Sequence, residues 1–208
     1  MSIVTANMSM SLDGFVNHPT DGVGILFGWY GRGDVATETA GTTETTETTD
    51  YGRVELKTSA EEAEMLADAK TTLGAIVYGR RSFEAAEGWN GTHPLGVPVV
   101  VLTHSVPAGW PRAGSSIHFV TEGGIAAAIA EARAVGGDKT VAIGSADLTQ
   151  QALNAGLLDE LTVDLVAAML GAGTRFFDNL ENTPYELEQM WVRPGNGVVH
   201  LGYRVLKP

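Results

Sequence analysis

The chain has 208 residues, of which 44% are hydrophobic, and it carries a formal net charge of −12 at pH 7. This length suits one domain with a buried core, so we expect a single domain over residues 1–208. The negative charge argues against a nucleic-acid partner, because phosphate backbones need a basic face. No apolar run approaches the roughly 20 residues of a membrane helix, and no leader pattern opens the chain. We therefore expect no membrane contact and a cytoplasmic location.

Two absences narrow the chemistry further. The sequence has no cysteine, which excludes disulfides, thiolate metal sites and cysteine nucleophiles. Its five histidines lie far apart, without the spacing of a metal site, so we expect no metal. The motifs G-x-S-x-G, G-x-x-x-x-G-K-[ST] and G-x-G-x-x-G are missing, which counts against a hydrolase, a P-loop enzyme and a conventional Rossmann dehydrogenase.

The first predicted strand covers residues 3–11, where apolar and polar residues alternate loosely, and Asp13-Gly14 closes it in a turn. Asp13 either caps that turn or takes a direct part in the chemistry, and the sequence leaves both readings open. The following residues, 17–33, are rich in glycine and predict a loop that groups Phe27, Trp29 and Tyr30. These rings are either a satellite core cluster or a wall on which a flat ring stacks.

Residues 35–50 form a low-complexity segment of threonine and glutamate. The segment has too little apolar surface to offset the entropy of ordering, so we expect a mobile surface loop with a lid as one role. Ser59 and Glu62 then form a capping-box pattern, which predicts a helix from residue 60 onward. Glu61 and Glu62 fall in its first turn, where acids ordinarily interact with the helix dipole.

A strand-to-helix junction follows at residues 73–84. The apolar run 73–78 stops at Gly79, and Arg80, Arg81 and Ser82 come next, with Ser82 expected to cap a short helix. Two guanidinium groups beside a helix start favour a bound phosphate. The alternative is a surface turn with solvated arginines.

Two later strands end in the same manner. Residues 97–102 give way to Thr103, His104 and Ser105, and residues 139–143 stop at Gly144. We expect Gly144 to let a ligand approach the backbone closely, and Ser145 or Asp147 to cap the helix that follows. Because parallel strands end at a common edge, the three junctions predict one ligand crevice at the carboxyl edge of an α/β sheet.

The last third of the chain is rich in strands. Residues 161–166 form a predicted strand, and residues 185–192 and 198–206 form a predicted hairpin around Asn196-Gly197, a strong hairpin signal. The sheet is therefore expected to end antiparallel. An exposed sheet edge and an apolar tail predict a homodimer through residues 160–206.

Several of these motifs, in this order, resemble the dihydrofolate reductase superfamily, and most closely its branch with the reductase domain of riboflavin biosynthesis, the RibD C-terminal domain. They are Ser11-Leu12-Asp13-Gly14, the three junctions, Gly156–Leu161 and Leu170–Phe177. The resemblance covers about residues 3–206. It implies a three-layer α/β fold with a mixed, mostly parallel sheet and an antiparallel C-terminal hairpin.

The resemblance also implies an NADPH-dependent reductase that passes hydride to a pterin-, flavin- or pyrimidine-like substrate, as in the riboflavin-pathway reduction of 5-amino-6-(5-phosphoribosylamino)uracil. It places the substrate under Phe27, Trp29 and Tyr30, and it makes Asp13, or water, the proton source. Alternatives are a true dihydrofolate reductase and a nucleotide-binding protein that kept the fold without the chemistry. The implied NADP(H) contacts are Gly79, Arg80, Arg81, Ser82, Thr103, His104, Ser105, Gly144, Ser145, Ala146, Asp147, Leu148 and Thr149.

Overall fold

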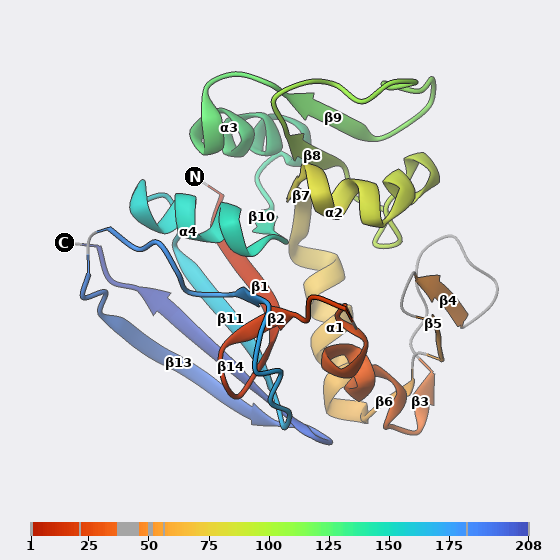
Figure 1. Cartoon of the computed structure of the whole chain (residues 1–208), viewed down its shortest axis with the longest axis vertical. Helices are drawn as coiled ribbons and strands as arrows, with labels where there is room; N and C mark the ends of the chain where they lie inside the picture. Colours follow the sequence, from red (N-terminus) through yellow and green to blue (C-terminus); the bar gives the residue numbers. More distant parts are fainter. Residues whose placement is uncertain are drawn as a thin grey trace.

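The computed structural model describes residues 2–20, 22–36, 46–49, 52–55, 57–181 and 183–207. Its centre is an eight-stranded sheet with the order β13-β14-β11-β1-β10-β7-β8-β9 (Figure 1). Neighbours from β11 to β9 pair parallel, whereas β14 pairs antiparallel with both β11 and β13. The mixed sheet and the C-terminal hairpin confirm the predicted fold class. The strands are β1 Val4–Ser11, β7 Leu73–Gly79, β8 Val99–Leu102, β9 Ile117–Val120, β10 Thr140–Ile143, β11 Glu160–Val166, β13 Leu187–Pro194 and β14 Val198–Val205.

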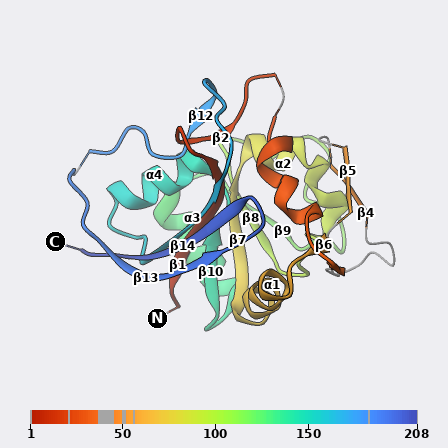
Figure 2. The same ribbon diagram turned by 90° about the horizontal axis from the view of Figure 1, so that it is seen from below.

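Helices cover both faces of this sheet (Figure 2). One face carries α3 Gly124–Gly136 and α4 Ala146–Asn154, and the main core lies between them and the strands. The other face carries α1 Ala60–Thr72, α2 Arg80–Ala85 and a 3-10 helix, η1, at Gly24–Gly31. Among the described residues, no helix is long and apolar enough to cross a membrane.

The other described strands form two-stranded sheets that are separate from the central sheet. The strand β2 Phe15–Asn17 pairs with β12 Thr174–Arg175, β3 Val35–Ala36 with β6 Lys57–Thr58, and β4 Thr46–Thr49 with β5 Gly52–Glu55. Residues 35–36 and 46–49 of the segment predicted as a surface loop therefore form strands, and the mobility of the segment stays a prediction. Residues 37–45 and 50 of that segment lie outside the described residues.

The helix starts follow from local hydrogen bonds. The predicted capping box is confirmed at α1, where Ser59 Oγ accepts from Glu62 N at 3.2 Å and Glu62 Oε2 accepts from Ser59 N at 2.7 Å. The predicted cap at Ser82 is wrong, because α2 begins at Arg80 with Gly79 as its N-cap residue. Helix α4 has Ser145 at its N-cap position but no side-chain capping bond. There, Asp147 accepts from Gln151 Nε2 at 2.7 Å.

Candidate functional site

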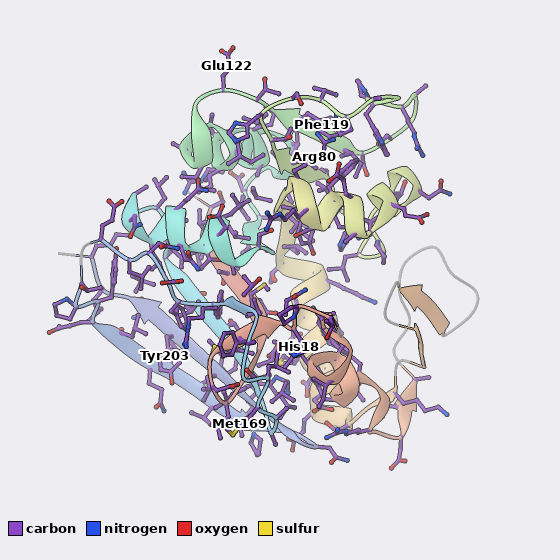
Figure 3. The ribbon with its side chains drawn as sticks, viewed as in Figure 1. His18, Arg80, Phe119, Glu122, Met169 and Tyr203 are labelled. Atoms are coloured by element: carbon purple, nitrogen blue, oxygen red, sulfur yellow. The ribbon has the colours of Figure 1, made fainter. Side chains whose placement is uncertain are left out.

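The three predicted junctions meet at one edge of the sheet, because β10, β7 and β8 are neighbours. Gly79 N donates to Ser145 Oγ at 3.0 Å, which ties the end of β7 to the end of β10. Arg80 Nη1 donates to the carbonyl of Ser105 at 2.9 Å, which ties β7 to the chain that follows β8. Figure 3 shows Arg80 beside α2 and β8.

A cleft of about 2690 Å³ opens over these strand ends. This volume exceeds the roughly 300–1,000 Å³ of an ordinary small-molecule pocket, so there is room for a cofactor and a second molecule together. The lining includes every cofactor contact implied by the resemblance except Thr149. Thr149 is buried, and its hydroxyl donates back to the carbonyl of Ser145 at 2.9 Å, so it supports the start of α4 from behind.

The two arginines of the junction differ in their surroundings. Arg80 is held in place, since its Nε donates to Glu84 Oε1 at 2.7 Å and its Nη1 also reaches Thr103 Oγ1 at 3.4 Å. Arg81 lies exposed on the cleft lining and makes no side-chain hydrogen bond or ion pair with the described residues. One guanidinium group is thus preorganised and the other is available to an anionic ligand.

The structure gives a packing reason for the glycine at position 144, and the predicted approach of a ligand there stays a prediction. A Cβ added to Gly144 would lie 2.2 Å from Cε1 of Tyr78. The ring of Tyr78 therefore occupies the space that a side chain at this position would need. The same close packing buries the phenol, and this burial raises the pKa of Tyr78 to about 12.

Asp13 lies outside the cleft lining and ties two loops together. Its carboxylate accepts from Ser11 Oγ at 2.6 Å, from Leu170 N at 3.0 Å and from Gly171 N at 2.7 Å. The bond from Ser11, aided by the two backbone bonds, lowers the pKa of Asp13 to about 2. A carboxylate that stays ionised at neutral pH has no proton to give, so the geometry favours a structural role in which Asp13 joins its turn to residues 170–171.

The aromatic residues of the predicted loop lie on η1 instead. Trp29 is only 1% exposed; its indole N–H donates to Ser9 Oγ at 3.3 Å and its ring stacks on Tyr30 with centroids 3.8 Å apart. Trp29 is thus a core residue, whereas Phe27 and Tyr30 are half-buried. All three line the cleft. The core-cluster interpretation therefore fits Trp29, and Phe27 and Tyr30 are the rings available for stacking with a ligand.

A second aromatic wall comes from an unusual turn after α2. Residues 87–91 all have positive φ values, including 47° at Trp89 and 51° at Asn90, which L-residues rarely adopt. This turn places Trp89 with its ring centroid 4.9 Å from Tyr78 and 5.1 Å from His93. His93 accepts from Leu95 N at 3.2 Å, and burial lowers its pKa to about 4.

Sequence reasoning missed the polar floor of the cleft. It consists of alternate residues on the face of the sheet that α1 covers: Thr5, Asn7, Ser9, Thr140, Thr162 and Asp164. Asn7 is exposed although β1 is a central strand, so the helix layer leaves the sheet open there. The sequence did hold a signal for this floor: every second residue of β1 is polar. Strands that are buried on both faces are usually apolar on both, so the pattern indicates one open face.

A buried charged cluster lies at the end of this floor. His200 Nδ1 lies 2.7 Å from Asp164 Oδ1, and His200 Nε2 lies 3.5 Å from Glu62 Oε1. All three residues are at least 97% buried. Burial alone lowers the pKa of His200, but the hydrogen bond to Asp164 and the two nearby carboxylates outweigh it, so the net shift is upward.

Comparisons with known proteins agree with this geometry. Residues 2–200 match the model of the RibD C-terminal domain, and no curated protein matches the sequence. Three solved structures share the fold at 13–17% identity, a likeness that establishes the fold alone.

The first is a putative riboflavin biosynthesis protein from Shewanella sp. PV-4, with a TM-score of 0.68, 17% identity and 99% of each chain covered. The second is a pyrimidine reductase-like protein from Corynebacterium diphtheriae, with a TM-score of 0.59 and 13% identity. The match covers 100% of this chain and 93% of that one. The third is the riboflavin biosynthesis reductase Rib7 of Saccharomyces cerevisiae, with a TM-score of 0.59 and 14% identity. The match covers 99% of this chain and 90% of that one. The chain therefore belongs to the RibD C-terminal domain family and has the dihydrofolate-reductase-like fold.

Proposed function

We propose that the protein is an NADPH-dependent reductase that acts on a pyrimidine-like substrate, of the type that reduces 5-amino-6-(5-phosphoribosylamino)uracil. Family membership supports the reaction class. The single observation that supports NADPH as the cofactor is that Arg80, Arg81 and the ends of β8 and β10 meet at one wide cleft. A cytoplasmic location and one domain over residues 1–208 are part of the same proposal.

The residues of the chain would bind and orient, since the cofactor would supply the hydride. Arg80 and Arg81 would hold phosphate oxygens, with Thr103, His104 and Ser105 beside the adenosine end. The backbone N–H groups at the start of α4 would face the pyrophosphate. The substrate ring would lie on the polar floor between η1 and the turn that carries Trp89. Water in the cleft would supply the proton, because Asp13 is held ionised.

Replacing both Arg80 and Arg81 by alanine tests the cofactor assignment. Hydrogen bonds to charged groups contribute roughly 1.5–3 kcal/mol each, so the affinity for NADPH should fall about ten- to a hundredfold or more. The affinity for NADH should barely change, since NADH lacks the 2′-phosphate. Arg112→Ala is the control, because Arg112 is exposed, stacks over Trp110 and lies outside the cleft lining.

Calorimetric titration with both cofactors reads the result. An equal loss of affinity for NADPH and NADH would show that the arginines bind the pyrophosphate that both cofactors share. An unchanged NADPH affinity would show that Arg80 and Arg81 do not bind the cofactor. A protein that binds NADPH but turns over no pterin, flavin or pyrimidine would instead fit a nucleotide-binding protein without chemistry. The one observation that favours a nucleotide-binding protein without chemistry is that Asp13, with its lowered pKa, has no proton to donate.

We also propose a homodimer that forms through the C-terminal hairpin. The strand β13 is an edge strand of eight residues, and long uncovered edges tend to pair with another chain. Its neighbourhood exposes Leu187, Val192 and Val199. A second copy of the chain would cover these apolar side chains.

A further inference from the structure

His93 is a buried imidazole on the wall of the cleft, and only one of its two ring nitrogens has a partner. The residue is 7% exposed and belongs to the cleft lining. Its Nδ1 accepts a hydrogen bond from Leu95 N at 3.2 Å. Burial lowers the pKa of His93 to about 4, so the ring is neutral at pH 7. Because Nδ1 accepts, the single proton of the neutral ring lies on Nε2.

The Nε2–H group of His93 has no acceptor in the part of the chain that the structure describes. Three side-chain atoms in that part are sealed from solvent without a partner, and they belong to Glu62, Ser116 and His200. His93 Nε2 is not among them, so it stays accessible, and the space that its side chain lines is the cleft. Water can satisfy this N–H in an open cleft. A ligand that displaces the water loses affinity unless it brings an acceptor of its own.

The backbone and two aromatic rings fix the direction of this N–H group. A β-turn begins at His93, where Gly96 N donates to the His93 carbonyl at 2.8 Å and Pro94 restricts the second position of the turn. The centroid of the imidazole lies 5.1 Å from that of Trp89 and 5.8 Å from that of Tyr78. The donor is therefore held in place before a ligand binds, which reduces the entropy lost on binding.

The surroundings of the donor indicate which acceptor fits it. The rings of Tyr78 and Trp89, with centroids 4.9 Å apart, line the cleft beside His93. Aromatic surface of this kind favours contact with another flat ring. Burial alone accounts for the lowered pKa of His93, so no charged group of the described residues acts on the imidazole. A neutral donor without a neighbouring cation suits a neutral oxygen, such as an oxo group on a heteroaromatic ring.

We propose that His93 determines specificity by donating a hydrogen bond from its Nε2–H group to a ring oxo group of the substrate. This inference rests on the proposed function for the class of ring. It adds which group of the ring is recognised and which atom recognises it. An amino group at the same ring position would set one N–H group against another and would bind more weakly. No bond is made or broken at His93, since its role is recognition.

Two substitutions separate the donor from the structural role of the imidazole. Asparagine places its amide at the position of Nδ1, so His93→Asn can still accept from Leu95 N but has no group at the position of Nε2. Glutamine reaches the position of Nε2, so His93→Gln keeps a donor there. A purely structural role predicts that His93→Asn resembles the wild type, whereas the proposal predicts that His93→Gln does. His118→Asn is the control, because His118 Nδ1 lies 3.1 Å from Glu131 and the residue is outside the cleft lining.

Calorimetric titration of the full chain with 5,6-diaminouracil and 2,4,5,6-tetraaminopyrimidine tests the proposal. The second probe carries amino groups in place of the two oxo groups of the first, and pH 8 keeps the amino groups unprotonated. The wild type and His118→Asn should bind 5,6-diaminouracil about tenfold more tightly, as expected for one hydrogen bond gained and one donor not left unpaired. His93→Asn should lower this ratio to less than about threefold, and His93→Gln should restore most of it.

NMR spectroscopy of the chain with isotope-labelled histidine detects the same contact directly. The Nε2–H signal of His93, identified by its loss in His93→Asn or His93→Gln, should shift when 5,6-diaminouracil saturates the wild type. An unmoved signal, equal wild-type affinities, no binding of either probe, or a ratio that survives in His93→Asn would overturn the proposal. If His93→Asn does not fold, the signal of the wild type decides. NADPH titration tests the proposed function separately, since its failure removes that function while the probe ratio still reports on His93.

Discussion

Burial of His93 makes the stability of this protein depend on pH in a window that the structure defines. Burial lowers the pKa of His93 from 6.5 to about 4. Because the folded pKa lies below the unfolded one, His93 favours the folded state fully above about pH 6.5, and this contribution is lost as the pH falls toward 4. Each pKa unit corresponds to 1.36 kcal/mol, so the loss across the window is about 3 kcal/mol.

Urea unfolding of the wild type and of His93→Asn at pH 7, 6, 5 and 4 measures this effect. Asparagine can accept from Leu95 N as the imidazole does, but it does not titrate. The wild type should lose about 3 kcal/mol relative to His93→Asn between pH 7 and 4. His104→Asn, at an exposed position, is the control and should track the wild type. A difference between wild type and His93→Asn that stays constant with pH would refute the reasoning.

Two further predictions concern packing and assembly. Gly144→Ala should lower the free energy of unfolding by about 1–3 kcal/mol, because the new Cβ overlaps the ring of Tyr78, whereas Gly79→Ala should change it little, since its Cβ would meet Ser145 Oγ at 3.6 Å. Thermal unfolding compares the two, and equal stabilities would contradict the packing argument. Light scattering should give twice the chain mass of 21.9 kDa at micromolar concentration, and Val192→Lys should halve it. A monomer mass for the wild type would remove the dimer.

The fold was predictable wherever a local signal decides the backbone. The Ser59 capping box, the Asn196-Gly197 turn and the apolar runs ending at Gly79 and Gly144 each act within a few residues, and all appear in the structure. The left-handed turn at residues 87–91 was not predictable, because packing of Trp89 and a close approach at Gly88 impose it. A Cβ on Gly88 would lie 2.5 Å from the ring of Trp110, a contact between distant parts of the chain.

The site was predictable to the extent that strand ends carry it. Arg80, Ser105 and Ser145 were grouped from the sequence because parallel strands end together. The acid cluster was missed because Asp164 and His200 are 36 residues apart and meet only through strand register. The direction of the Thr149 side chain was not predictable. Its position one turn into α4 follows from the sequence, but its hydroxyl donates to the carbonyl of Ser145 and the residue lies outside the cleft lining.

The place of β1 in the sheet also sets the order in which the protein can assemble. This strand, the first in the chain, lies between β10 and β11, so Val4 pairs with Val141 and Ser11 with Val166. At roughly 5–20 residues per second of synthesis, β1 emerges on the order of ten seconds before either neighbour exists. Until then its unpaired edges and apolar face stay open to chaperones or to other nascent chains. Such non-local pairing slows folding, so the centre of the sheet can form only after β11 has been made, near the end of the chain.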